Sequence, residues 1–205
     1  MMPISQVANT IFDELIIKYH LKDDIAQVSN NPYSPDLIEF LLYQKCWIDT
    51  IQWHVEDLVR DPEIAAAKGI EYKRLIDKLN QQRTDTVEKI DDFYLHFFKM
   101  VVAQPHAQLN TESPAWAIDR LSILALKIYH MRQETLRSDL PKAKELEAKQ
   151  KLQILLEQRS DLSQSIDELL EAISTGEKRM KVYRQMKMYN DPELNPVLYS
   201  KNKSN

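Results

Sequence analysis

Apolar residues recur every three or four positions along most of this chain, which is the spacing of one face of an α-helix. The pattern predicts a first helix over residues 5–19, whose apolar face holds Val7, Ile11, Phe12, Leu15 and Ile16. It predicts further helices over residues 34–60, 62–100, 113–136 and 141–173, and a last one over residues 177–189. We therefore expect an all-α fold.

Proline residues mark where several of these helices should begin. Ser34-Pro35, Asp61-Pro62 and Ser113-Pro114 each combine a good N-cap residue with a proline in the first turn. Gly176 suits the position after a helix C-terminus, because glycine adopts the left-handed conformation found there. These signals predict the starts of three helices and the end of a fourth.

The predicted helices group into two hairpins, residues 34–98 and 113–173, joined by a linker at 101–112. Such hairpins can pack into an up-down bundle, with an added helix at each end. We expect one domain over residues 1–205, because this length can bury a single substantial core.

Two short motifs recur at the same separation, which predicts an internal duplication. Trp53-His54 is echoed 76 residues later by Tyr129-His130, and Arg83 by Arg159, each arginine followed by a hydroxyl residue and an aspartate. A constant offset between two matched landmarks is the signature of a repeated supersecondary unit.

Both echoed arginines fall on the apolar faces of their helices, where a charge needs a partner. If each hairpin turns at its predicted loop, Arg83 lies opposite Glu39 and Arg159 lies opposite Asp119. The favoured interpretation is a polar layer of two buried ion pairs that fixes helix register. In the alternative, the same four residues line a cavity for an anionic or zwitterionic ligand.

His54 and His130 each have a carboxylate three or four residues further along the helix, a spacing that could hold a metal. A structural role is the favoured interpretation for both, and we assign no metal ligands and no cofactor. With Arg83 placed beside Glu39, His54 would lie roughly 22 Å from that layer along its helix. The histidines and arginines would then belong to separate sites.

Asp85, Glu88 and Asp92 share one helix face, and Asp161, Gln164 and Glu168 repeat the pattern. Carboxylates at this spacing bind Mg²⁺ in all-α pyrophosphohydrolases. A solvated face opposite the core is favoured. Metal-dependent hydrolysis of phosphate or pyrophosphate therefore stands as the alternative to a non-enzymatic module that binds a ligand or a partner.

Composition narrows the protein's class without naming an activity. Only two glycines are present, so a glycine-rich phosphate-binding loop is excluded, and the net charge of −4 predicts no nucleic-acid partner. Cys46 is the only cysteine, so the chain can form no internal disulfide. No signal peptide or membrane-spanning run is recognisable, which predicts a cytoplasmic protein.

The predicted C-terminal helix carries basic residues mixed with methionine and tyrosine. Such a helix can pack on the bundle or dock on a partner, and we consider a homodimer through it. The apolar run from Leu194 to Tyr199 should lie along the bundle or in a neighbouring subunit.

Two long strings resemble a family that has no assigned activity, domain-of-unknown-function family 4254. They are SPAWAIDRLSILALKIYHM over residues 113–131 and MKVYRQMKMYNDP over residues 180–192. The segments around Trp47, Trp53-His54 and Arg83 resemble the first half of the same family. The resemblance implies a bacterial, cytoplasmic, helical protein and carries over no catalytic residue.

Overall fold

The computed structural model describes residues 2–186, 188 and 191–202, and it is 66% helical, which confirms the all-α prediction. The helices are α1 (Ile4–Tyr19), α2 (Ile38–Val59), α3 (Ala66–Phe97), α4 (Pro114–Thr135), α5 (Lys142–Ser174) and the short α6 (Pro196–Asn202). Two short strands, β1 (Gln108–Leu109) and β2 (Lys178–Arg179), pair in parallel.

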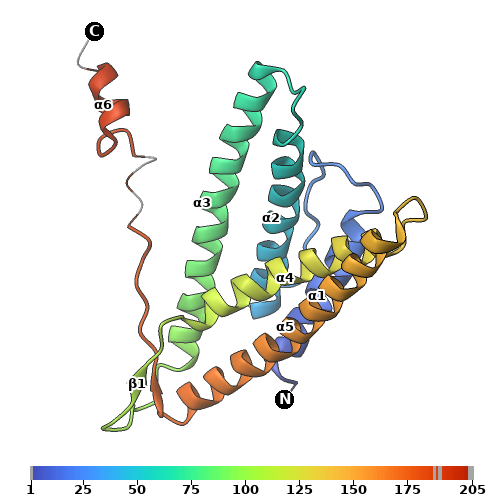
Figure 1. Ribbon diagram of the computed structural model, residues 1–205. Helices are drawn as coiled ribbons and strands as arrows, with labels where there is room; N and C mark the ends of the chain where they lie inside the picture. The colour runs from blue at the N-terminus through green and yellow to red at the C-terminus, as the bar shows by residue number, and fades with distance from the viewer. Residues whose placement is uncertain (1, 187, 189–190, 203–205) are drawn as a thin grey trace.

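The hairpins α2–α3 and α4–α5 pack around α1, which contacts α2, α4 and α5 (Figure 1). The first helix is therefore a central element of the bundle rather than an addition to its edge. The second hairpin runs obliquely across the first in Figure 1.

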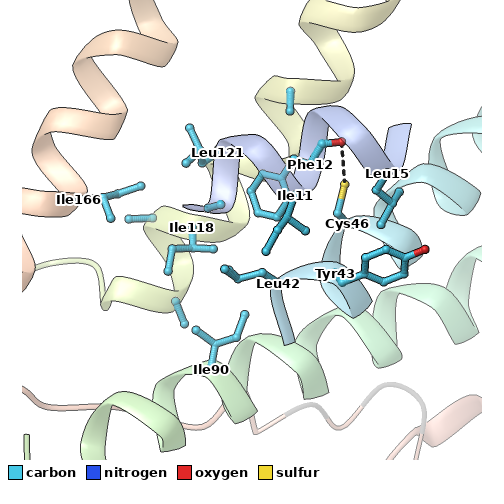
Figure 2. Packing of buried hydrophobic residues seen from close by; sticks show 14 of the residues in the cluster. Ile11, Phe12, Leu15, Leu42, Tyr43, Cys46, Ile90, Ile118, Leu121 and Ile166 are labelled. Carbon is cyan, nitrogen blue, oxygen red and sulfur yellow. Dashed lines mark hydrogen bonds between the residues drawn. The ribbon is translucent and has the colours of Figure 1, made fainter. Parts of the chain in front are cut away.

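The core collects apolar side chains from all five long helices, as Figure 2 shows for Ile11, Leu42, Ile90, Ile118 and Ile166. The side chain of Cys46 is fully buried there, with its Sγ 4.0 Å from the carbonyl oxygen of Phe12 (Figure 2). Burial raises the pKa of the Cys46 thiol to about 12, so the thiol stays protonated and unreactive at neutral pH.

The predicted start of α4 is confirmed. Ser113 is the N-cap, its Oγ accepts a hydrogen bond from the Trp116 amide, and Pro114 occupies the first turn. Asp91 on α3 braces this cap, because it accepts hydrogen bonds from the Ser113 hydroxyl (2.7 Å) and the Ala115 amide (3.3 Å). The cap therefore also joins α3 to α4.

The other two predicted starts were about four residues too early. Ser34 and Asp61 begin tight turns instead of capping helices: the Leu37 amide donates to the Ser34 carbonyl, and the Ile64 amide to that of Asp61. The α2 helix starts only at Ile38 and α3 only at Ala66. The connection between them, residues 60–65, is accordingly longer than the predicted turn.

The helix predicted over residues 177–189 is wrong for its described part. Gly176, with φ 76°, ends the α5 turn as expected, but the chain then enters β2 and forms no helix through residue 186. The carbonyls of Gly176 and Glu177 accept hydrogen bonds from the amides of Gln104 and Gln108 in the linker. The backbone at the start of the predicted helix is therefore already paired.

Candidate functional site

Three histidines at or near the ends of three helices meet near one end of the bundle. His20 follows the last residue of α1, His54 lies in the last turns of α2, and His130 in the last turns of α4. Their ring centroids are 5.0 to 5.4 Å apart in all three pairs. One nitrogen from each ring lies within 4.8 Å of the others. We call this group the histidine cluster.

Each imidazole is held by an aromatic ring from a different helix. The stacked pairs are His20 on Tyr129 (4.2 Å between centroids), His54 on Tyr19 (5.0 Å) and His130 on Trp53 (4.9 Å). In sequence, each of these aromatic residues directly precedes a histidine of the cluster other than the one it stacks on. The stacking restricts ring rotation and so orients the nitrogens.

The Nε2 atoms of all three histidines are buried and have no hydrogen-bond partner within the described residues. The tautomer of His20 follows from its other nitrogen, because Nδ1 lies 2.7 Å from the carbonyl oxygen of Ile16, which can only accept. In the neutral ring the proton therefore resides on Nδ1, and Nε2 carries the lone pair. Buried polar atoms without partners are rare and need a physical explanation.

The environment keeps two of these imidazoles neutral. Burial lowers the pKa of His54, and burial together with the charges that His20 and His54 would carry lowers the pKa of His130 to about 4. Both rings are therefore uncharged at neutral pH. A neutral imidazole is the form that binds metal ions.

Three imidazoles that each bring a nitrogen within 4.8 Å of the others suit a divalent transition metal, of which Zn²⁺ is the usual example. The hydrogen bond from His20 Nδ1 to a backbone carbonyl is the outer-shell contact that commonly orients a metal-bound histidine. The cluster can therefore supply three ligands and leave one tetrahedral position for another group.

A second set of polar residues lies deeper in the bundle and is fully paired. Lys45 forms ion pairs with Asp49 and with Asp119, the latter at 2.9 Å. Arg83 donates two hydrogen bonds of 2.7 and 2.5 Å to Asp119. Ser122 donates a further hydrogen bond to Asp49 (2.6 Å). We call these residues the ionic network, and its two cations balance its two carboxylates.

The two carboxyls of the network respond differently to burial. Burial raises the pKa of Asp49 even though Lys45 opposes it. Burial acts on Asp119 in the same direction, but Arg83 and Lys45 together hold its pKa below the ordinary value. Asp119 is the better-compensated anion because it alone receives the bidentate guanidinium.

The predicted partners of both arginines were wrong. Arg83 pairs with Asp119 and lies 3.8 Å from Asp49 instead of meeting Glu39. Asp119 is thus not available to Arg159, which binds Asp13 of α1 at 2.8 and 3.0 Å. The four residues Glu39, Arg83, Asp119 and Arg159 therefore do not form one layer.

The long connection between α2 and α3 explains the shifted register. Gln52 bonds Asn80 at 3.0 Å, which sets Arg83 beside Asp49, ten residues and about 15 Å further along α2 than Glu39. His54 follows Asp49 by only five residues, or roughly 8 Å of helix rise. The histidine cluster and the ionic network are therefore close neighbours, and their predicted separation was too large.

A cavity of about 430 Å³ lies beside the ionic network. Asp49 and Arg83 reach its wall, next to Gln52, Trp53 and Asp57. The guanidinium of Arg83 is already engaged by Asp119, so the network offers this cavity little unpaired charge.

The predicted acidic stripe on α3 is covered by the chain's own C-terminal segment. Arg184 binds Asp92 at 2.6 Å and Glu88 at 3.3 Å, and the Gln185 amide donates to Glu88. Asp85 accepts a hydrogen bond from Gln81. These contacts occupy the carboxylates that the phosphohydrolase alternative would use for Mg²⁺.

Residue spacing found two of the three clustered histidines and missed His20. The missed signal is local: Tyr19-His20 is a third aromatic–histidine dipeptide, beside Trp53-His54 and Tyr129-His130. Lys45 and Asp49 were also missed, although their separation of four residues places them on one helix face.

The sequence model of one family, described as "Protein of unknown function (DUF4254)", matches residues 39–182. That range includes His54 and His130 but begins after His20. No curated protein and no solved structure matches the chain. None of the described helices combines the length and apolar character needed to cross a membrane.

Proposed function

We propose that this protein, which belongs to the DUF4254 family, binds a divalent transition-metal ion through His20, His54 and His130. The observation that carries the proposal is the set of three buried Nε2 atoms without partners, in rings that bring one nitrogen each within 4.8 Å of the others. A bound cation would satisfy all three at once. The protein would then be a helical ligand-binding module whose ligand is the ion.

Calorimetric titration of chelator-treated protein with Zn²⁺ tests the proposal. We expect one ion per chain, and an affinity at least about tenfold weaker in His130→Ala, because one of three ligands is lost. His96→Ala is the matched control, since His96 is exposed on α3 away from the cluster, and it should bind like the wild type.

Circular dichroism of both variants shows whether they fold, and His54→Gln provides a second removal of a ligand. Wild-type protein that binds no Zn²⁺, Co²⁺ or Ni²⁺ would contradict the proposal. So would variants that fold and bind these ions as tightly as the wild type.

The enzymatic alternative, metal-dependent hydrolysis of phosphate or pyrophosphate, has less support. Glu88 and Asp92 are bound to Arg184, and no other feature favours Mg²⁺ at the α3 stripe. For Arg83 and Asp119 we infer a register-setting role, because each satisfies the other. Arg159 serves the same purpose between α5 and α1 through Asp13.

We also propose that two copies of the chain associate through the C-terminal segment. The observation that favours this is the position of α6, which stands apart from the bundle in Figure 1. It contacts no other helix or strand in the described part of the chain. Val197 and Leu198 on α6 are 65% and 38% exposed, and a partner would bury them. A cytoplasmic location stays a prediction.

A further inference from the structure

The histidine cluster supplies three ligands, and a structural metal site is completed by a fourth. Three aspartates lie near enough to affect pKa values in and around it. Asp23 and Asp57 act to raise the pKa of His54 and His130 against the larger effect of burial, and Asp24 acts to raise that of Tyr19. A fourth ligand from this set needs a carboxylate that no other group already engages.

Two of the three acids are already engaged. Asp57 accepts a hydrogen bond of 2.9 Å from Arg60 one turn further along the chain. Asp24 accepts one of 2.8 Å from the Ala26 amide, which closes a turn in the α1–α2 connection. The carboxylate of Asp23, in contrast, accepts no hydrogen bond within the described residues.

Asp23 is also the acid whose carboxylate lies beside the cluster. The amides of Lys22 and Asp23 both donate to the Tyr19 carbonyl, so the chain makes one further turn after α1 ends. Asp23 adopts a left-handed conformation, φ 50°, in this turn. Aspartate is one of the few residues besides glycine that adopt this conformation, which is common just after a helix ends.

The resulting distance suits a shared ion. Asp23 Oδ1 lies 3.7 Å from His54 Nε2, which is too long for a hydrogen bond between them. Two ligands of one tetrahedral Zn²⁺, each bound at about 2.0–2.2 Å, lie roughly 3.4 Å apart. A contraction of a few tenths of an ångström would therefore place both atoms on the same ion.

We propose that Asp23 is the fourth ligand, so that the site is a closed tetrahedral centre of three imidazoles and one carboxylate. The inference rests on the proposed function. With Asp23 as a ligand, the bound ion would link the α1–α2 connection to the ends of α1, α2 and α4. Because 58% of the Asp23 side chain is exposed, this ligand lies on the solvent side, where an ion can enter and leave.

Cobalt substitution tests this ligand directly, because four-coordinate Co²⁺ absorbs visible light far more strongly than six-coordinate Co²⁺. Chelator-treated wild type, Asp23→Asn and Asp24→Asn are titrated with Co²⁺, and Zn²⁺ affinity is then measured by competition with a chromophoric chelator. Asparagine tolerates the left-handed conformation, so the turn should persist in the first variant. The neighbouring Asp24 provides the matched control.

We expect Asp23→Asn to bind Zn²⁺ about tenfold more weakly or worse, with a fainter Co²⁺ spectrum. Asp24→Asn should keep the wild-type affinity and spectrum. If Asp23→Asn binds both ions as the wild type does, the fourth-ligand inference is wrong while the three-histidine site stands. If the wild type binds neither ion, the proposed function itself fails.

Thermal unfolding in the presence of chelator separates folding from ligation. The metal-free Asp23→Asn variant should unfold within a few degrees of the metal-free wild type, because this carboxylate makes no other described contact. Metal binding should then raise the unfolding temperature of the wild type more than that of the variant.

Discussion

Lys45 carries a charge and yet has no exposed surface. It is tolerated because Asp49 and Asp119 lie on either side of its ammonium group, and Arg83 completes the balance of charge. Desolvation costs several kcal/mol per ion, so such a network contributes less to stability than its hydrogen bonds suggest. Removing one charged member of the network is costly, because the remaining charges stay buried without a partner.

Asp119→Asn should therefore lower the free energy of unfolding by roughly 3 kcal/mol, since Lys45 and Arg83 would lose their common anion. Glu112→Gln is the control: it removes the partner of Arg120 in an exposed pair and should cost less than about 1 kcal/mol. Urea denaturation followed by circular dichroism measures both. Equal losses of unfolding free energy in the two variants would contradict the prediction that burial makes the shared anion costly to remove.

At the scale of helices and turns, the capping signals were informative only where tertiary contacts agreed with them. Ser113-Pro114 starts α4 because Asp91 on α3 supports the cap. Ser34-Pro35 and Asp61-Pro62 carry the same local signal but form turns instead. The extra residues in the second of these turns shifted the pairing of Arg83. Loop conformation, which sequence spacing does not specify, thus determined which carboxylate lies opposite Arg83.

The two glycines should respond in opposite ways to replacement by alanine. At Gly176 a Cβ would lie 2.6 Å from the Val102 carbonyl oxygen, and φ is 76°, so we expect Gly176→Ala to destabilise the fold by more than about 1 kcal/mol.

At Gly69, inside α3, the nearest atom to a new Cβ is 3.9 Å away, so Gly69→Ala should stabilise the fold by about 0.5–1 kcal/mol. Thermal unfolding of both variants measures the difference. Gly69→Ala thereby serves as the control for Gly176→Ala, and a loss of stability in both would contradict the assigned roles.

At the scale of the whole molecule, the histidine cluster joins residues that are far apart in the chain. Helical periodicity predicts which face of a helix is buried, and it does so for α1, α2 and α4. It does not predict how three helix ends meet, because that depends on crossing angles and loop lengths. His20 was missed for this reason, although the aromatic residue before it repeats the pattern at His54 and His130.

Removal of residues 191–205 tests the proposed association of two chains. Light scattering after size-exclusion chromatography should show a dimer for the full chain and a monomer for the truncated chain, with unchanged helical content of residues 1–190. A full chain that is monomeric at tens of micromolar would contradict the proposal, and so would a truncated chain that remains dimeric.

The stacking around the histidine cluster closes on itself: Tyr19 contacts His54, Trp53 contacts His130, and Tyr129 contacts His20. The stacked partners are therefore not neighbours along the chain. Loss of one of these aromatic rings would therefore leave a histidine on another helix without its stacked partner. Residues that look like three copies of one dipeptide thus act as three interhelical pairs, which link the ends of α1, α2 and α4 to one another.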